Sequence, residues 1–472
     1  MEHGVAVRMV RVFRHYIPNN IIWLIIIESI LIFSSVYVGV EIRFADPDDL
    51  TSFDESVLWI KALTFTIIMG GSLTAMGLYQ RSLIIDFASM MIRLFIGFGV
   101  GFALMTLSFY LFPELFLGRG VIGFAMITAF FGIIVSRTFF QKIISSESFK
   151  SRILIIGSGR HACQVEALRD KCNENGFEIV GFVPMNDCDI LVDESNVIEL
   201  TGTISEYSLE NDIDEIVIAV DDRRKKFPAT DLLNCKMEGI YIRDLVSFFE
   251  RITGHLQLDA LRPSSLIFST GFSHAVLQSS SKRIFDIVTS AIILIIASPI
   301  MLVTTIAIFI SSFGRDPVFY RQIRVGLNNQ PYDVLKFRSM KTDAEKDGAQ
   351  YAKKKDTRVT RIGSFIRTTR IDELPQLFNV LKGDMSFVGP RPERPEFVEG
   401  YNERIAHYAL RHKVKPGITG WAQICYPYGE SEADTKHKLQ YDLYYVKNYS
   451  LFLDFTIIFQ TLQVVLFGKG AR

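Results

Sequence analysis

Four long apolar stretches occupy the first third of the 472-residue chain. They cover approximately residues 21–40, 57–78, 91–112 and 120–140. Each is close to the ~20 residues that a helix needs to cross the hydrocarbon core of a bilayer. The first stretch, whose one charged residue is Glu28, is too long for a signal peptide, and more apolar stretches follow it. The pattern predicts a four-helix transmembrane bundle over residues 1–145.

Basic residues between these stretches indicate the orientation of the bundle, because cytoplasmic loops are enriched in Lys and Arg. Three arginines precede the first stretch, whereas the next loop, about 41–56, has six acidic residues and only Arg43 as a basic one. Further basic residues flank the later stretches, including Arg81, Arg93, Arg137, Lys142, Lys150 and Arg152. We therefore expect both ends of the bundle to face the cytoplasm. A membrane sensor or anchor would show the same pattern.

Short apolar runs alternate with helical pieces over residues 146–250, which is typical of an α/β domain with a mostly parallel sheet. The expected strands are Arg152–Ile156 and the runs "FEIVGFV", "NVIEL", "EIVIAVDD" and "GIYIRDL". The turn from Gly157 to Ala162 has the spacing G-x-G-x-x-A of a dinucleotide-binding loop. The acid expected at the end of the second strand is missing, because that strand ends at Val183-Pro184. We predict a Rossmann-like domain without a redox cofactor, and leave open the binding of another nucleotide.

Residues 251–281 form a polar connector, and another apolar stretch follows at about 287–310. It contains Ser298 and Pro299 near its middle, and a proline there kinks or breaks a helix. Both flanks are basic, and a true span would export one of them. We predict a re-entrant membrane helix, about 284–312, that returns to the cytoplasmic face; the alternative is a fifth span with a kink.

The last segment, 282–472, is predicted to be a mainly α domain. From Arg315 to Arg370 it has 14 Lys and Arg against 6 Asp and Glu, although the whole chain has a formal net charge of zero. The apolar run 451–467 is too short to span a bilayer and carries Asp454, Gln460 and Gln463, so we expect an interfacial helix. The five cysteines lack zinc-ligand spacing, which argues against a zinc site.

Two adjacent acids, Asp372 and Glu373, lie within this basic segment. The cations around them suit phosphate oxygens, which Arg meets bidentately and Lys as a point charge; they include Lys336, Arg338, Arg358, Arg361, Arg367, Arg370, Arg391 and Arg394. We expect the nearby positive charge to keep Asp372 ionised. An ionised Asp can coordinate magnesium or attack phosphorus. A structural salt-bridge network explains the charge pattern equally well.

Longer strings in this segment resemble the bacterial sugar transferase family, the monotopic polyprenyl-phosphate hexose-1-phosphate transferases or phosphoglycosyltransferases. The matching strings are "KRIFDIV", "KFRSM", "DTRVTRIGSFIRTTRIDELPQLFNVLKGDMSFVGPRPE", "VKPGITGWAQI" and "KLQYDLYYVKNYSLFLDF". With the four spans and the Rossmann-like domain, the chain resembles the long-form members, and the subgroup associated with exosortase-type exopolysaccharide loci.

The resemblance implies a bacterial inner-membrane enzyme that transfers a hexose 1-phosphate from a UDP-sugar to undecaprenyl phosphate. It implies that Asp372 is the nucleophile and a Mg²⁺ ligand, with Glu373 assisting. By the same resemblance, the substrate-binding residues would be Lys336, Arg338, Arg367, Arg391 and Asp442, and Ser298 with Pro299 would form the break in the re-entrant helix. Membrane lipid would be a further partner, and nucleic acid would not.

One departure from the family pattern is visible after "GWAQI", where many members continue with Asn-Gly-Arg. Here the chain continues "CYPYGE", without an Arg. We therefore expect part of the phosphate binding, or the choice of sugar, to differ from that of those members. Two alternative functions remain from the sequence: a nucleotide-sugar oxidoreductase or dehydratase that uses the Rossmann-like domain, and a non-catalytic membrane scaffold for polysaccharide assembly. The sequence names neither the sugar nor the pathway, and leaves a homodimer open.

Overall fold

The computed structural model describes most of the chain. The described residues are 9–12, 15–44, 57–79, 87–144, 150–174, 177–185, 190–200, 202–221, 227–261, 272, 276–342, 344, 357–426, 429 and 431–467. Contacts divide the chain into two compact units, which consist mainly of Tyr16–Gly254 and of His255–Arg472. The lysine run at 353–355 lies outside the described residues.

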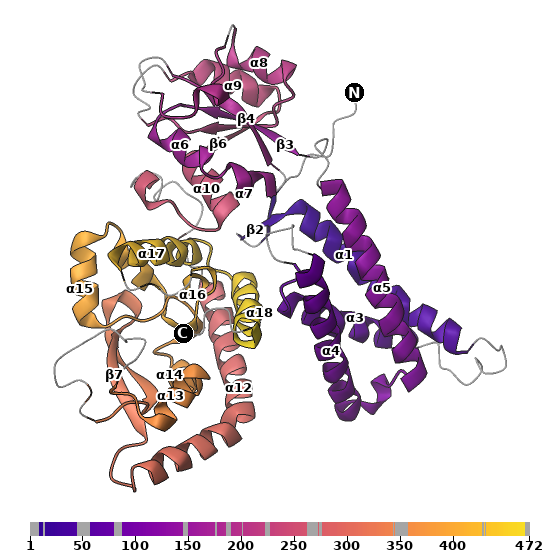
Figure 1. The fold of residues 1–472 in the computed structure, drawn as a ribbon, viewed down its shortest axis with the longest axis vertical. Coiled ribbons are helices and arrows are strands. Elements are labelled where there is room, and N and C mark those ends of the chain that lie inside the picture. Colours follow the sequence, from indigo (N-terminus) through magenta and orange to yellow (C-terminus); the bar gives the residue numbers. More distant parts are fainter. Residues whose placement is uncertain are drawn as a thin grey trace. The chain divides into compact units, whose positions relative to one another are not determined.

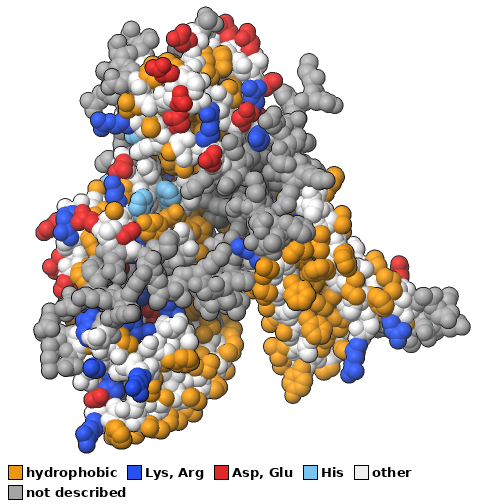
Figure 2. Space-filling view, viewed as in Figure 1, with side chains coloured by type: hydrophobic (Ala, Val, Ile, Leu, Met, Phe, Trp, Pro, Cys, Tyr) orange, Lys and Arg blue, Asp and Glu red, His pale blue; other side chains and the backbone are white. Residues whose placement is uncertain are grey.

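The N-terminal helices match the predicted apolar stretches (Figure 1). Two short strands, β1 (Met9–Val12) and β2 (His15–Pro18), precede α1 (Asn19–Arg43), α3 (Leu58–Ala75), α4 (Phe87–Leu111), η2 (Pro113–Leu115) and α5 (Arg119–Ile144). The four α-helices and α12, described below, are the described helices that are long and apolar enough to cross a bilayer. Large exposed side chains such as Phe95, Phe131 and Val135 cover their outer faces, as expected for contact with lipid (Figure 2).

A buried ion pair explains the charge in the first helix. The Arg137 Nε lies 2.8 Å from Glu28 Oε1, and Tyr79 donates a hydrogen bond to the same carboxylate. Charged residues inside membrane helices are stable when they pair in this way. Arg137 therefore belongs to the interior of the bundle, and it does not count among the loop charges that indicate orientation.

The second part of this unit is a parallel sheet with the strand order β4-β3-β5-β6. Its strands are β3 (Ser151–Ile156), β4 (Phe177–Val183), β5 (Glu215–Ile218) and β6 (Tyr241–Asp244). The helices are α6 (Arg160–Glu166), α7 (Arg169–Glu174), η4 (Glu194–Asn196), α8 (Ile204–Glu210), α9 (Ala229–Met237) and α10 (Leu245–Thr253). The α/β prediction is confirmed.

The expected strand "NVIEL" is wrong as an element of this sheet. Only one isolated bridge joins Val197 to Phe182. The 3₁₀ turn η4 takes the first residue of this run, and a capping box between Thr203 and Glu206 starts α8 shortly after the run ends.

The second unit begins with η5 (Leu258–Ala260) and the 36-residue helix α12 (Val276–Ser311), which contains Pro299. Figure 1 shows a bend between the two arms of α12, and prolines are the usual cause of such a kink. The remaining elements are β7 (Phe319–Val325), η6 (Leu327–Asn329), β8 (Pro331–Phe337), α13 (Arg361–Thr368), η7 (Ile371–Glu373), α14 (Gln376–Lys382), β9 (Ser386–Val388), α15 (Pro395–Arg404), η8 (Tyr408–Lys413), β10 (Gly417–Thr419), α16 (Trp421–Cys425), α17 (Glu432–Lys447) and α18 (Leu451–Phe467). Strands β7 and β8 form an antiparallel hairpin, and β9 and β10 form a parallel pair.

The base of α12 connects three other elements of this unit. The Arg283 guanidinium donates to the carbonyls of Val380 and Leu381 at the end of α14, at 2.6 and 2.7 Å. Asp286 accepts from Ser386 Oγ at 3.0 Å and thereby holds β9. Lys282 lies 2.9 Å from Asp454 on α18. The string "KRIFDIV" therefore fixes α14, β9 and α18, three segments that follow the acid pair in the chain.

The last helix, α18, lies in the predicted place, but Asp454 does not face water. Its side chain is fully buried, and it accepts a hydrogen bond from Tyr445 at 2.8 Å in addition to its ion pair with Lys282. This acid fixes α18 to the rest of its unit. An interfacial position for α18 stays a prediction.

Candidate active site

The acid pair lies in a single 3₁₀ turn between two short helices. Helix α13 ends at Thr368, and Arg370 then adopts the left-handed conformation with φ 59° and ψ 13°. A non-glycine residue pays a conformational cost for this backbone, and such residues cluster at functional sites. The reversal at Arg370 places Asp372 and Glu373 in η7, directly before Pro375 and α14.

Three cations surround the carboxylate of Glu373. Its Oε1 accepts from Arg391 Nη2 at 2.8 Å, and it lies 3.5 Å from Lys336 Nζ and 3.7 Å from Arg370 Nη1. The side chain is 12% exposed. Burial alone would raise the pKa of Glu373, but Arg391 and Lys336 outweigh burial and hold the pKa well below its usual range. Glu373 is therefore a fixed anion.

Asp372 has different surroundings. The residue is 9% exposed, and within the described part of the chain no hydrogen bond or ion pair engages its carboxylate. Burial, and after it the charge of Glu373, raises the pKa of Asp372 to about 6, although Lys336, Arg367 and Arg370 act in the opposite direction. Burial therefore outweighs the cations that we expected to keep Asp372 ionised. At neutral pH the carboxylate is still mostly ionised and more basic than an ordinary Asp.

Other residues singled out from the sequence lie in different settings. Lys336, at the end of β8, belongs to the cluster around Glu373. Arg338 is buried and forms an ion pair with Asp316, which connects it to the segment after α12. Asp442, on α17, is buried and paired with Arg411, an arginine that the sequence analysis did not single out. No short-range sequence signal joins these two residues, which are far apart in the chain.

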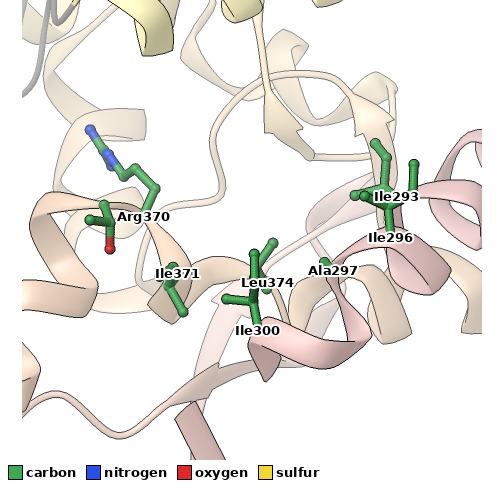
Figure 3. A pocket seen from close by; sticks show the side chains of 8 residues that line it. Ile293, Ile296, Ala297, Ile300, Arg370, Ile371 and Leu374 are labelled. Carbon is green, nitrogen blue, oxygen red and sulfur yellow. The ribbon is translucent and has the colours of Figure 1, made fainter. Parts of the chain in front are cut away.

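An apolar pocket of about 330 Å³ lies beside the acid pair (Figure 3). Its walls are Ile293, Ile296, Ala297 and Ile300 from α12, together with Ile371 and Leu374 from the turn of the acid pair. Arg370 also lines this pocket and contributes a charged side chain to the lining. The pocket thus joins the bend of α12 to a cation that also contacts Glu373.

The glycine turn of the Rossmann-like domain contains an anion that the chain itself supplies. Asp221 Oδ2 accepts from the backbone N–H of Arg160 at 2.9 Å, and Oδ1 accepts from that of His161 at 3.0 Å. In dinucleotide-binding folds, such N–H groups at the start of the helix bind the pyrophosphate. A Cβ at Gly159 would overlap with the same carboxylate. The turn as it stands therefore does not fit a dinucleotide phosphate, and the absence of a redox cofactor stays a prediction.

Comparison with known proteins gives two family matches. Residues 277–468 match the family described as bacterial sugar transferase, and residues 74–226 match one described as a CoA-binding domain. The chain is 43% identical, over 51% of its length, to an Aeromonas hydrophila protein named UDP-N-acetylgalactosamine-undecaprenyl-phosphate N-acetylgalactosaminephosphotransferase. That match spans 56% of the relative, about half of its length.

Two relatives match over more of their length. An uncharacterized sugar transferase of Haemophilus influenzae is 32% identical over 78% of this chain and 81% of its own length. A Salmonella typhimurium protein named undecaprenyl-phosphate galactose phosphotransferase is 32% identical over 68% of this chain and 70% of its own length. These long matches extend beyond the region of the acid pair.

Proposed function

The chain belongs to the bacterial sugar transferase family, and on that premise we propose that it transfers a hexose 1-phosphate from a UDP-sugar to undecaprenyl phosphate and releases UMP. The observation that carries this proposal is the difference between the two adjacent acids. Glu373 is held by three cations, whereas the buried carboxylate of Asp372 has a raised pKa and no described partner. One acid can organise the cations, and the other can attack.

The reaction would proceed in two displacements. An oxygen of Asp372 attacks the phosphorus that bears the sugar, the new P–O bond to Asp372 forms, and the P–O bond to UMP breaks. The bond electrons leave with UMP, whose charge Arg391, Lys336 and Arg370 would stabilise. A phosphate oxygen of the lipid then attacks the phosphorus of the covalent phospho-sugar and frees Asp372. One site thereby serves a soluble substrate and a membrane substrate in turn.

The acid pair also fits a role for Mg²⁺. Magnesium is commonly bound by one or two carboxylates together with substrate phosphates. The described residues contain no cluster of three or more metal-ligating side chains, so the unengaged Asp372 would be the protein ligand and the diphosphate would supply the others. A bound Mg²⁺ would neutralise charge on the diphosphate.

The acceptor lipid has a matching surface beside the acid pair. The pocket walls from α12 are apolar and suit the first isoprene units of undecaprenyl phosphate, while Arg370 suits its phosphate. Exposed apolar side chains such as Ile295, Val303 and Phe309 continue along α12 and suit contact with bilayer lipid. The lipid phosphate would thus reach Asp372 from the membrane side.

The bend of α12 supports a re-entrant helix with its break at Ser298 and Pro299. A straight helix of 36 residues would be about 54 Å long. Yet Arg283 in the first arm holds α14, while Met301 and Ile308 in the second arm pack with Phe337 and Ile366 of the same unit. Both arms therefore belong to one domain. With four spans before it, this arrangement keeps the acid pair on the cytoplasmic face of the inner membrane, where UDP-sugars are available.

The test is release of UMP by purified membranes that contain the protein. The panel should include UDP-N-acetylgalactosamine, UDP-galactose and UDP-glucose, because the relatives carry names with different sugars. We expect UMP from at least one donor when undecaprenyl phosphate is present, and its loss in Asp372→Asn. Asp384→Asn is the matched control, since Asp384 pairs with the exposed Lys382.

Absence of UMP with every donor would contradict the transferase and favour the scaffold. Unchanged UMP release in Asp372→Asn would contradict the role of the acid pair. A donor-dependent change in NAD absorbance without UMP would instead favour the oxidoreductase.

A further inference from the structure

The backbone of the Pro-Arg-Pro segment after β9 is held by its carbonyl groups. Prolines have no N–H to donate, so carbonyls are the main backbone groups by which such a segment can be fixed. Pro390 O accepts from Gly417 N at 2.9 Å, and Glu393 O accepts from Val325 N at 2.9 Å. Between them, Pro392 O accepts from Arg324 Nη1 at 3.1 Å. This segment carries Arg391, which holds Glu373.

The carbonyl of Arg391 itself is held by a buried arginine. Arg411 Nη2 donates to this oxygen at 2.9 Å and lies 2.8 Å from Asp442 Oδ2. The other terminal nitrogen of Arg411 donates to the Tyr408 hydroxyl at 2.8 Å. One guanidinium nitrogen thus joins the carboxylate of Asp442, on α17, to the main chain of Arg391.

Asp442 is too buried to be a direct substrate contact. Its side chain is 4% exposed, and that of Arg411 is 6% exposed. A buried guanidinium needs a partner of opposite charge, because an uncompensated buried charge is strongly unfavourable. The planar guanidinium also has fixed donor directions, so the position of Asp442 sets the direction of the bond to Arg391.

We propose that Asp442 and Arg411 are positioning residues for the phosphate-binding Arg391. The relay runs from the Asp442 carboxylate through Arg411 to the Arg391 carbonyl, and from the Arg391 guanidinium to Glu373 at 2.8 Å. This inference rests on the proposed function and deepens it. It replaces the substrate contact that the family resemblance implies for Asp442 with an action through the main chain of Arg391.

The test is a double-mutant cycle between Asp442 and Arg391 in the full-length protein. Asp442→Asn keeps the size and removes the charge that orients Arg411. We expect single-turnover UMP release to fall on the order of 10²-fold, as small misplacements of a positioning group do. In an Arg391→Lys background, where the guanidinium fork is already lost, the same change should cost less than 5-fold, roughly, because the relay then has nothing to position.

The matched control is Glu432→Gln on the same helix. Glu432 pairs with Arg404 at 3.3 Å in an exposed ion pair, so its loss should leave UMP release unchanged. Equal losses from Asp442→Asn in both backgrounds would overturn the relay, since a general loss of folded protein acts on both alike. Unchanged activity in Asp442→Asn would overturn it as well.

Should Asp442→Asn not fold, Arg411→Lys provides the same comparison, because it keeps the ion pair and removes the fork. The donor KM separates a substrate contact from a positioning role. We expect kcat to fall and KM for the UDP-sugar to stay within about 3-fold, whereas a direct contact would raise KM. Failure of the wild type to release UMP from any donor would contradict the proposed function, and would be distinct from equal losses across the cycle.

Discussion

Replacing Glu373 by Gln should shift the pH–rate profile of the first displacement. Its acid limb, the pH range over which the rate of adduct formation rises, should move toward lower pH. In the wild type, adduct formation requires ionised Asp372, so its rate should rise with pH and reach half of its maximum near pH 6. The difference between about 6 and the ordinary value of 3.8 corresponds to roughly 3 kcal/mol that disfavours ionisation. Burial is the larger cause of this raised pKa, and the charge of Glu373 is the second.

The Gln variant removes the second cause and frees Lys336, Arg370 and Arg391 to act on Asp372 alone. Both changes lower the pKa of Asp372. We expect the limb to move by about one pH unit, roughly 1.4 kcal/mol, because burial remains. The maximal rate should also fall, since a less basic carboxylate is a weaker nucleophile.

The assay is single-turnover labelling of the protein by a sugar-labelled donor without acceptor lipid, between about pH 4 and pH 8. Omitting the acceptor excludes the titration of its phosphate, which also falls near pH 6. Asp384→Asn should leave the limb in place. A limb that stays, or that moves toward higher pH, would refute the electrostatic coupling between the two acids.

Three further outcomes are expected. Arg391→Lys keeps the charge and loses the guanidinium fork, so kcat in steady-state assays should fall on the order of 10²-fold while the melting temperature stays unchanged. An equal loss of kcat in Arg394→Lys would indicate a nonspecific effect on the Pro-Arg-Pro segment. Single cysteines at Ser280 and at Arg315 should both resist an impermeant thiol reagent in intact cells, whereas external labelling near Arg315 would show a true span. Neither NAD nor CoA should raise the unfolding temperature of the wild type, because Asp221 takes the N–H groups of the glycine turn; a saturable rise would show that a nucleotide binds despite Asp221.

Long apolar stretches, and the buried strands other than "NVIEL", were predictable because each is specified by local periodicity. The helices α1, α3, α4 and α5 follow from runs of about 20 apolar residues, and β4 follows from "FEIVGFV". The acid pair Asp372 and Glu373 was also visible in the sequence, because two adjacent acids stand out within a strongly basic segment. The local sequence pattern was sufficient to predict elements that depend on contacts between neighbouring residues or on contact with lipid.

The different roles of the two acids were not predictable from spacing. Which acid receives Arg391 and Lys336 depends on β8 and on the segment after β9, which reach Glu373 only in the fold. The burial that raises the pKa of Asp372 is likewise a tertiary property. The same holds for Arg411, whose partners come from α17 and the Pro-Arg-Pro segment.

The central claim is that Asp372 carries the sugar phosphate between donor and acceptor. The most direct measurement is mass spectrometry of peptides after the protein has been mixed with its UDP-sugar without acceptor lipid. The account predicts a phospho-hexose on the peptide that contains Asp372, its disappearance when undecaprenyl phosphate is added, and its absence in Asp372→Asn. An active protein that never carries this adduct, and that gives intersecting lines when both substrates are varied, would contradict it.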